Sequence, residues 1–129
     1  MPITCTIDHD RKLVTATAAG EVGLKDMEDY LDGLVTGEAM PYPKLFDATT
    51  AVPRLSDDDM MMLGARVSAY RAFDPRGPLA IVVGSTASHE LAARFANLGG
   101  AARAAGIFWT IDDARRWLDN QMKLATQRR

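Results

Sequence analysis

The residue types that most often carry catalysis are few and widely spaced in this chain. The single cysteine, Cys5, and the two histidines, His9 and His89, have no carboxylate or nucleophile at a useful spacing. A nucleophilic site needs a thiol or hydroxyl beside a base that is itself oriented by a further group. The segments Gly99-Gly100 and Gly84-Ser85-Thr86 also lack the lysine and the full glycine spacing of phosphate-binding loops. We therefore expect a protein that is not an enzyme and that uses no cofactor.

The densest polar cluster is Ser56 followed by Asp57, Asp58 and Asp59. Grouped carboxylates can hold Mg²⁺, and Asp47 could join the three aspartates at the end of a strand. The alternative is that Ser56 and Asp59 form a capping box, with the other two aspartates at the positive end of the helix dipole. Capping accounts for the cluster without a metal, so we predict a helix start and no metal site.

Three consecutive methionines follow this cluster. Residues so placed span about 200° of a helix, so Met60, Met61 and Met62 cannot all share one face. Either neighbouring elements bury all three, or some form an apolar patch for self-association or a ligand pocket. The candidate interaction surface consists of Met60, Met61, Met62, Tyr70 and Phe73.

Charge is unevenly divided along the chain. Residues 1–64 carry 12 acids and 5 bases, whereas residues 65–129 carry 5 acids and 10 bases. Either the folded protein has separate acidic and basic surfaces, or the two halves of the chain interleave in the fold so that their charges mix. Basic residues form no run longer than a pair, which argues against binding along a nucleic-acid backbone.

The length of 129 residues predicts one domain, spanning residues 1–129. The longest apolar run, Leu79 to Val83, is far too short to cross a bilayer, so we expect no integral membrane association. The first residues lack the charged and apolar regions of a signal peptide. A cytoplasmic location is the resulting expectation.

Hydrophobic periodicity alternates between strand and helix along the chain. Period-2 or continuous apolar runs predict strands, and apolar residues spaced at 3.6 predict helices between them. A polar loop through Thr49, Thr50 and Pro53 is expected before the second helix. Strands are predicted over residues 3–7, 13–19, 44–48, 79–83 and 107–109, with helices beginning near Leu24, Ser56, Thr86 and Thr110.

This order predicts an α/β fold with a five-stranded mixed sheet and four helices, arranged β-β-α-β-α-β-α-β-α. The short polar turn at residues 9–11 predicts that the first two strands form an antiparallel hairpin. Each later strand is reached through a helix, which predicts parallel pairing by right-handed crossovers.

The pattern resembles the STAS domains, the anti-sigma-factor antagonist-like family, in a branch related to the CRAL-TRIO lipid-binding fold. The residues that carry the likeness are Gly20-Glu21-Val22-Gly23-Leu24, Lys44-Leu45-Phe46-Asp47, Leu79-Ala80-Ile81-Val82-Val83, Glu90-Leu91-Ala92-Ala93-Arg94-Phe95 and Asp113-Ala114-Arg115-Arg116-Trp117-Leu118. The resemblance implies a regulatory module that binds a protein partner or a second copy of itself.

In that family a serine at the start of the helix after the third strand is phosphorylated, and the matching position here is Ser56. This chain departs from the family motif, because no glycine follows and three aspartates crowd the serine. A phosphate there would add negative charge beside existing carboxylates. Helix capping and phosphorylation are therefore the two alternatives for Ser56.

Two functions follow from these observations. The first is a non-enzymatic STAS-like interaction module, homodimeric, whose contact region is the methionine-rich helix. The second is a carrier or sensor of a small apolar molecule or lipid, with a pocket between the second and third helices and the sheet. The expected polar rim of that pocket consists of Asp47, Thr49, Thr50, Ser85 and Thr86.

Overall fold

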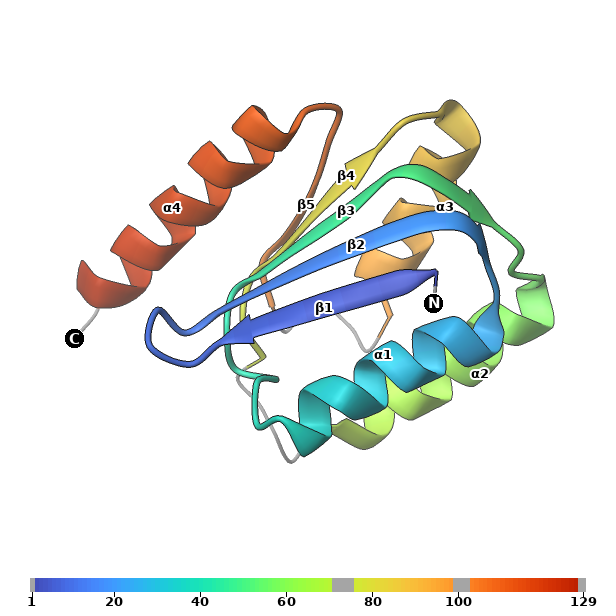
Figure 1. Ribbon diagram of the computed structural model, residues 1–129, viewed down its shortest axis with the longest axis horizontal. Helices are drawn as coiled ribbons and strands as arrows, with labels where there is room; N and C mark the ends of the chain where they lie inside the picture. Colours follow the sequence, from blue (N-terminus) through green and yellow to red (C-terminus); the bar gives the residue numbers. More distant parts are fainter. Residues whose placement is uncertain (1, 71–75, 99–102, 128–129) are drawn as a thin grey trace.

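The computed structural model describes residues 2–70, 76–98 and 103–127, and these contain five strands and four helices in the predicted order (Figure 1). The elements are β1 (Ile3–Asp8), β2 (Leu13–Val22), α1 (Leu24–Thr36), β3 (Lys44–Pro53), α2 (Asp57–Ser68), β4 (Leu79–Val83), α3 (Thr86–Ala96), β5 (Ala105–Phe108) and α4 (Ile111–Gln127).

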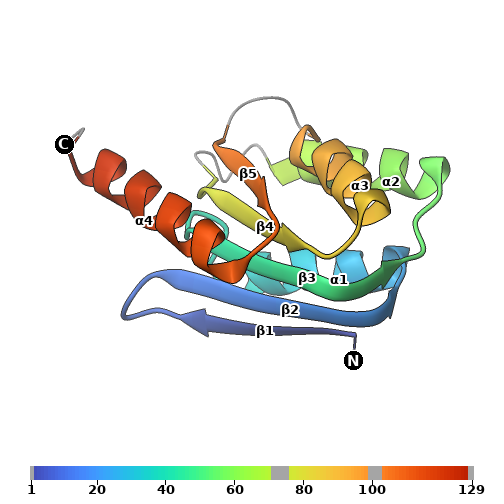
Figure 2. The ribbon, with the colours of Figure 1, turned by 90° about the horizontal axis from the view of Figure 1, so that it is seen from above.

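The sheet has the order β1-β2-β3-β4-β5, so strands adjacent in sequence are adjacent in space. β1 and β2 pair antiparallel and every later pair is parallel, which confirms the expected mixed sheet. Parallel crossovers are right-handed as a rule, and here each one moves a single strand further in the same direction. The three connecting helices α1, α2 and α3 therefore lie on one face of the sheet (Figure 2).

The last helix, α4, follows the final strand and packs on the opposite face. β4 shows how the two faces are separated: Leu79, Ile81 and Val83 belong to the core under α1–α3, whereas Ala80 and Val82 pack towards α4. All five residues of β4 are buried, as expected of a parallel strand covered on both faces.

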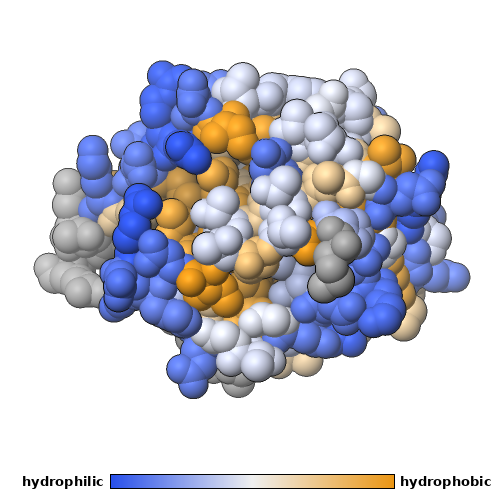
Figure 3. Space-filling model, in the orientation of Figure 1, coloured by the Kyte–Doolittle hydropathy of each residue, from blue (hydrophilic) through white to orange (hydrophobic). Residues whose placement is uncertain are grey.

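α4 reaches only part of its face of the sheet, contacting β3, β4 and β5. Seen from the side of β1, hydrophilic residues cover α4 and α1, and apolar and neutral residues gather over the strands between them (Figure 3). None of the helices in the described ranges has the length and apolar character needed to cross a bilayer.

The predicted polar loop after the third strand is wrong, because β3 continues through Thr49 and Thr50 to Pro53. β2 is equally long and pairs with this extension, although the register shifts between Thr17 and Ala19. The shift lets both strands run past the end of β4. Thr49, Thr50 and Val52 are residue types that favour strands, and pairing with the long neighbour β2 continues the strand to Pro53.

The uneven charge of the two halves is partly neutralised by ion pairs between them. Arg66 on α2 bonds to Glu28 at 3.0 Å and to Asp32 at 2.6 Å, both on α1. Arg94 on α3 lies 3.0 Å from Asp57 at the start of α2. The basic second half therefore meets the acidic first half across the helical layer.

Gly84, directly after β4, approaches the backbone of β3 so closely that a Cβ atom there would collide with the carbonyl of Thr49. We expect Gly84→Ala to lower the free energy of unfolding by about 1–3 kcal/mol, because backbone must move to admit the methyl group. Chemical denaturation followed by circular dichroism measures this loss.

Gly33→Ala is the matched control, since Gly33 lies in α1 with open space around its Cα. There the same methyl group should be neutral or stabilise the helix by up to about 1 kcal/mol. Equal losses at the two sites would contradict the close approach at Gly84.

Candidate functional site

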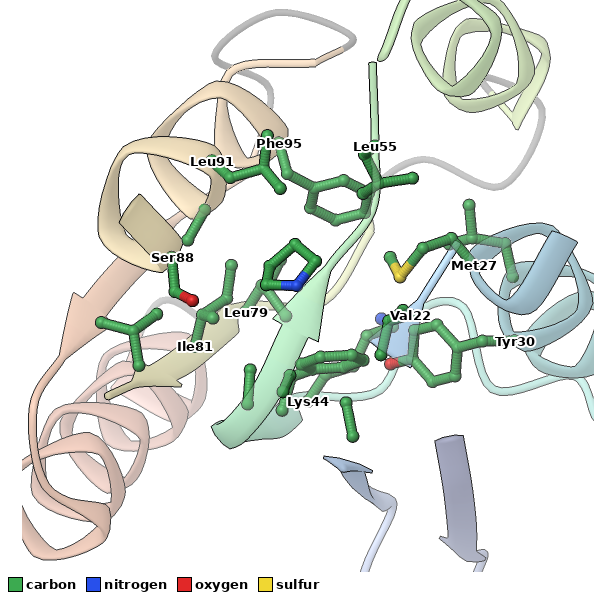
Figure 4. Close-up of a pocket in the computed structure, with 18 of the residues that line it drawn as sticks. Val22, Met27, Tyr30, Lys44, Leu55, Leu79, Ile81, Ser88, Leu91 and Phe95 are labelled. Carbon is green, nitrogen blue, oxygen red and sulfur yellow. The ribbon is translucent and has the colours of Figure 1, made fainter. Parts of the chain in front are cut away.

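An apolar cavity of about 90 Å³ lies between α1, α3 and the sheet. Figure 4 shows α1 and α3 on opposite sides of this space, with β3 between them. α2 contributes Met60, and Leu55 lies in the segment that precedes α2. The wall is almost entirely apolar and includes Val22, Met27, Leu79, Ile81, Leu91 and Phe95.

The lining follows β3 from its first residue, Lys44, to its last, Pro53. Most wall residues around Lys44 are buried, although Arg103 is partly exposed. At the other end Pro53, Leu91 and Phe95 are all partly exposed. The cavity is therefore narrow and elongated, closed at the amino ends of the parallel strands and more open at their carboxyl ends.

Lys44 provides a cationic group at the closed end. Its side chain is 2% exposed, and its Nζ donates hydrogen bonds to the carbonyl oxygens of Met40 and Tyr42. Burial, together with the positive charges of Arg103 and Arg76, lowers the pKa of Lys44 to about 7. Among the described residues no carboxylate pairs with this amine, so only carbonyl oxygens hold it.

Tyr30 reaches the same cavity from α1. Its side chain is 8% exposed, and within the described ranges its hydroxyl has no hydrogen-bond partner. In Figure 4 the ring extends from α1 and directs the hydroxyl into the cavity. Burial raises the pKa of Tyr30, while the charge of Arg103 acts in the opposite direction. This hydroxyl is thus a neutral donor with no acceptor in the described protein.

The three basic residues converge because each one precedes a parallel strand. Lys44 opens β3, Arg76 lies shortly before β4, and Arg103 lies shortly before β5. Amino ends of parallel strands meet at one edge of a sheet. The backbone N–H of Gly77 also donates to the carbonyl of Met40, the same oxygen that accepts from Lys44. Arg76 is consequently buried beside Lys44, with 5% of its surface exposed.

Comparison with known proteins identifies the architecture. No family model matches the sequence, and no curated protein matches it. The fold is similar to that of an uncharacterized protein of the DUF3478 family from Shewanella loihica PV-4, which has a SpoIIAA-like fold. The TM-score is 0.59 and the sequence identity is 21%, and the match covers 90% of this chain and 93% of that chain. An anti-sigma factor antagonist from Mycobacterium paratuberculosis has a TM-score of 0.57 and 16% identity, over 91% and 94% of the two chains. The chain has a STAS-like fold.

The predicted pocket rim lies away from the cavity of this STAS-like fold. Asp47 accepts hydrogen bonds from the backbone and hydroxyl of Thr49, and Thr50 is exposed. Ser85 caps α3 by accepting from the backbone N–H of Ser88. None of the proposed rim residues is in the cavity wall, which comprises side chains of α1 as well as α3. The five rim candidates are Asp47, Thr49, Thr50, Ser85 and Thr86.

At the start of α2 the structure contains the predicted capping box. The Ser56 hydroxyl accepts from the Asp59 backbone N–H at 3.1 Å, and the Asp59 carboxylate accepts from the Ser56 backbone N–H at 2.9 Å. Asp57 faces Arg94. In the part of the chain that the structure describes, no cluster of acidic, histidine or cysteine side chains is arranged to hold a metal ion. Phosphorylation of Ser56 stays a prediction.

The candidate interaction surface is divided by the fold. Met60 is 3% exposed and packs in the core, whereas Met61 and Met62 are 73% and 54% exposed. Tyr70 is buried, with its hydroxyl 3.5 Å from Asp32. Phe73 lies outside the described residues. Only the two exposed methionines are therefore available at the surface of α2.

The sequence analysis did not identify Lys44 or Tyr30 as site residues, although the position of Lys44 in its strand predicts that it is buried. In the run Lys44-Leu45-Phe46, alternation places the lysine on the same face as Phe46, which belongs to the main core. A lysine on the core side of a central strand is rarely buried without a partner. Tyr30 also lies on the apolar stripe of α1, where a tyrosine is an ordinary core residue.

The lowered pKa of Lys44 predicts a pH-dependent stability. At neutral pH the unfolded chain holds this proton and the folded chain partly releases it, so stability rises as the pH increases above about 7. Between pH 6 and pH 8 we expect the free energy of unfolding to rise by about 1 kcal/mol from this residue. Urea denaturation at the two pH values measures the change.

Lys44→Met is the control, because methionine has an unbranched side chain of nearly the same length and no titrating group. The change in the free energy of unfolding between the two pH values is measured for both proteins. The difference between these two changes is the contribution of Lys44, because the other titrating groups are present in both. Burial also raises the pKa of Cys5 and of Tyr30, and both acids remain in the variant. The same pH dependence in the two proteins would show that Lys44 does not titrate in this range.

Proposed function

We propose that this protein is a non-enzymatic, cytoplasmic regulatory module of STAS-like fold that binds a small, largely apolar molecule between α1, α3 and the sheet. The observation that carries this proposal is the elongated apolar cavity, which runs along β3 and is partly exposed at one end. Most ligand sites are concave and apolar, with a few polar groups that orient the ligand.

The size of the cavity limits the ligand. At about 90 Å³ it is smaller than the engineered cavity of about 150 Å³ that binds benzene in another protein. A short alkyl chain fits this space better than a long lipid chain, which would require α1 and α3 to separate. Among the described residues the wall contains no histidine, cysteine or carboxylate, which supports a binding role over catalysis.

Titration with 1-hexanol, followed by ¹H–¹⁵N NMR, tests this proposal. We expect saturable shifts confined to residues around the cavity. Ala51→Leu should weaken hexanol binding about tenfold or more, because Ala51 is in the wall and a larger side chain would occupy the space.

Ala19→Leu is the matched control. Ala19 lies on the neighbouring strand β2, is exposed, and is not in the cavity wall. Native mass spectrometry of the wild-type protein from its own host then identifies any molecule it retains. Absence of saturable hexanol binding, or equal weakening in both variants, would contradict a ligand role for the cavity.

A second candidate function is supported by the exposed apolar side chains of α2. Met61 and Met62 lie side by side on this helix, and adaptable methionines are common at contact surfaces. The solved structures with a similar fold include an anti-sigma factor antagonist. We propose that this face of α2 contacts a second copy of the chain, giving a homodimer.

The double variant Met61→Lys and Met62→Lys should shift sedimentation equilibrium from dimer to monomer, since charges would be buried at the interface. The control carries Asp119→Lys and Asn120→Lys, two exposed positions on α4. A monomeric wild-type protein, or a dimer that tolerates the α2 variant, would exclude this contact.

A further inference from the structure

We propose that the closed end of the cavity binds the carboxylate of a short-chain carboxylic acid, with the apolar chain lying along β3. Lys44 and Tyr30 would donate to the two carboxylate oxygens. This inference rests on the proposed function, because it assigns the chemical class of ligand to the same cavity.

The position of the polar groups is the first argument. Lys44 and Tyr30 come from different elements, β3 and α1, yet both line the buried end of one apolar cavity. Figure 4 shows the Tyr30 hydroxyl directed into this space. Arg103 is also in the wall, and its charge acts on both Tyr30 and Lys44. Donors and positive charge therefore converge on the same small volume.

The unused hydrogen-bonding capacity is the second argument. A lysine ammonium has three N–H donors, and carbonyl oxygens of Met40 and Tyr42 accept two of them. Within the described residues, the hydroxyl of Tyr30 has no acceptor at all. A buried donor left unsatisfied is costly, so an acceptor that enters the cavity gains from both groups.

The sign of the charge is the third argument. Lys44, Arg76 and Arg103 lie close enough for the two arginines to disfavour the charged form of the lysine. The cavity wall formed by the described residues contains no aspartate or glutamate that would offset the charge of Lys44. An anion placed there would stabilise the ammonium form of Lys44, because opposite charges attract strongly in a poorly solvated site. A cation or a neutral alcohol gains no such interaction.

The structural alternative is that Lys44 only ties together the loop before β3. Its two carbonyl bonds do perform that task. That role does not explain why the buried Tyr30 hydroxyl has no acceptor among the described residues. It also does not explain why Lys44 and Tyr30 both line the closed end of the apolar cavity. Ligand binding accounts for both observations.

The test compares hexanoate with 1-hexanol, two probes with the same chain length that differ in the charge of the head group. Both are titrated into wild-type protein at pH 6.5, and ¹H–¹⁵N NMR gives the dissociation constants. We expect hexanoate to bind about tenfold more tightly or better, in line with a charge-assisted hydrogen bond. Shifts should include the backbone amides near Tyr30 and Lys44.

Two variants separate the groups. Lys44→Met should weaken hexanoate binding about tenfold or more and leave hexanol binding unchanged or improved. Tyr30→Phe should weaken hexanoate binding several-fold without a loss of stability, since it removes a hydroxyl that has no partner in the described chain. Hexanol binding reports that each variant is folded and that its cavity is intact.

The outcomes distinguish the two proposals. If hexanol binds and hexanoate binds no better, or if Lys44→Met keeps the preference for hexanoate, the carboxylate site is excluded and the apolar cavity remains a ligand site. If neither probe binds, both proposals fail together.

Discussion

The parallel alignment of β3, β4 and β5 is the constraint from which the rest of the molecule follows. Because these strands run in one direction, all their amino ends meet at one edge and all their carboxyl ends at the other. Lys44, Arg76 and Arg103 each precede one of these strands, so the topology gathers them. Ligands of open α/β sheets usually bind at the carboxyl ends, which makes this basic edge unusual.

The cavity exists because several of the residues in its wall have small side chains. α1 packs against β1 and α2, and α3 packs against β3, β4 and β5, so the space between the two helices lies over the middle of the sheet. Alanines line much of it, namely Ala18, Ala48, Ala51 and Ala92. Larger residues at these positions would fill the space. The cavity between α1 and α3 therefore exists because these four wall positions carry alanine.

Most of the fold could be predicted from the sequence because the signals were local. Alternating apolar residues identify the strands, the Ser56 and Asp59 pair identifies the start of α2, and the wholly apolar β4 identifies a strand covered on both faces. The end of β3 was missed because its pairing partner, β2, is distant in sequence. Strand length depends on that partner and on the register shift near Thr17.

The site was harder to predict for the same reason. Its groups come from α1, β3 and the segments before β4 and β5, and no short motif joins them. Sequence reasoning looked instead to Asp47 and Ser85, whose side chains are engaged in local hydrogen bonds. Lys44 could have been suspected from its face of the strand, whereas the unsatisfied hydroxyl of Tyr30 becomes visible only in three dimensions.

The partnerless hydroxyl of Tyr30 and the carbonyl-held amine of Lys44 have a consequence for protein engineering. Phenylalanine at Tyr30 removes an unsatisfied buried hydroxyl, whereas an apolar residue at Lys44 removes a buried amine together with its two carbonyl bonds. A selection for heat resistance would therefore tend to enrich the change at Tyr30. Laboratory evolution towards a more thermostable protein would thus remove a polar group from the closed end of the cavity first. Natural sequences that keep Tyr30 would be retaining it despite that thermodynamic pressure.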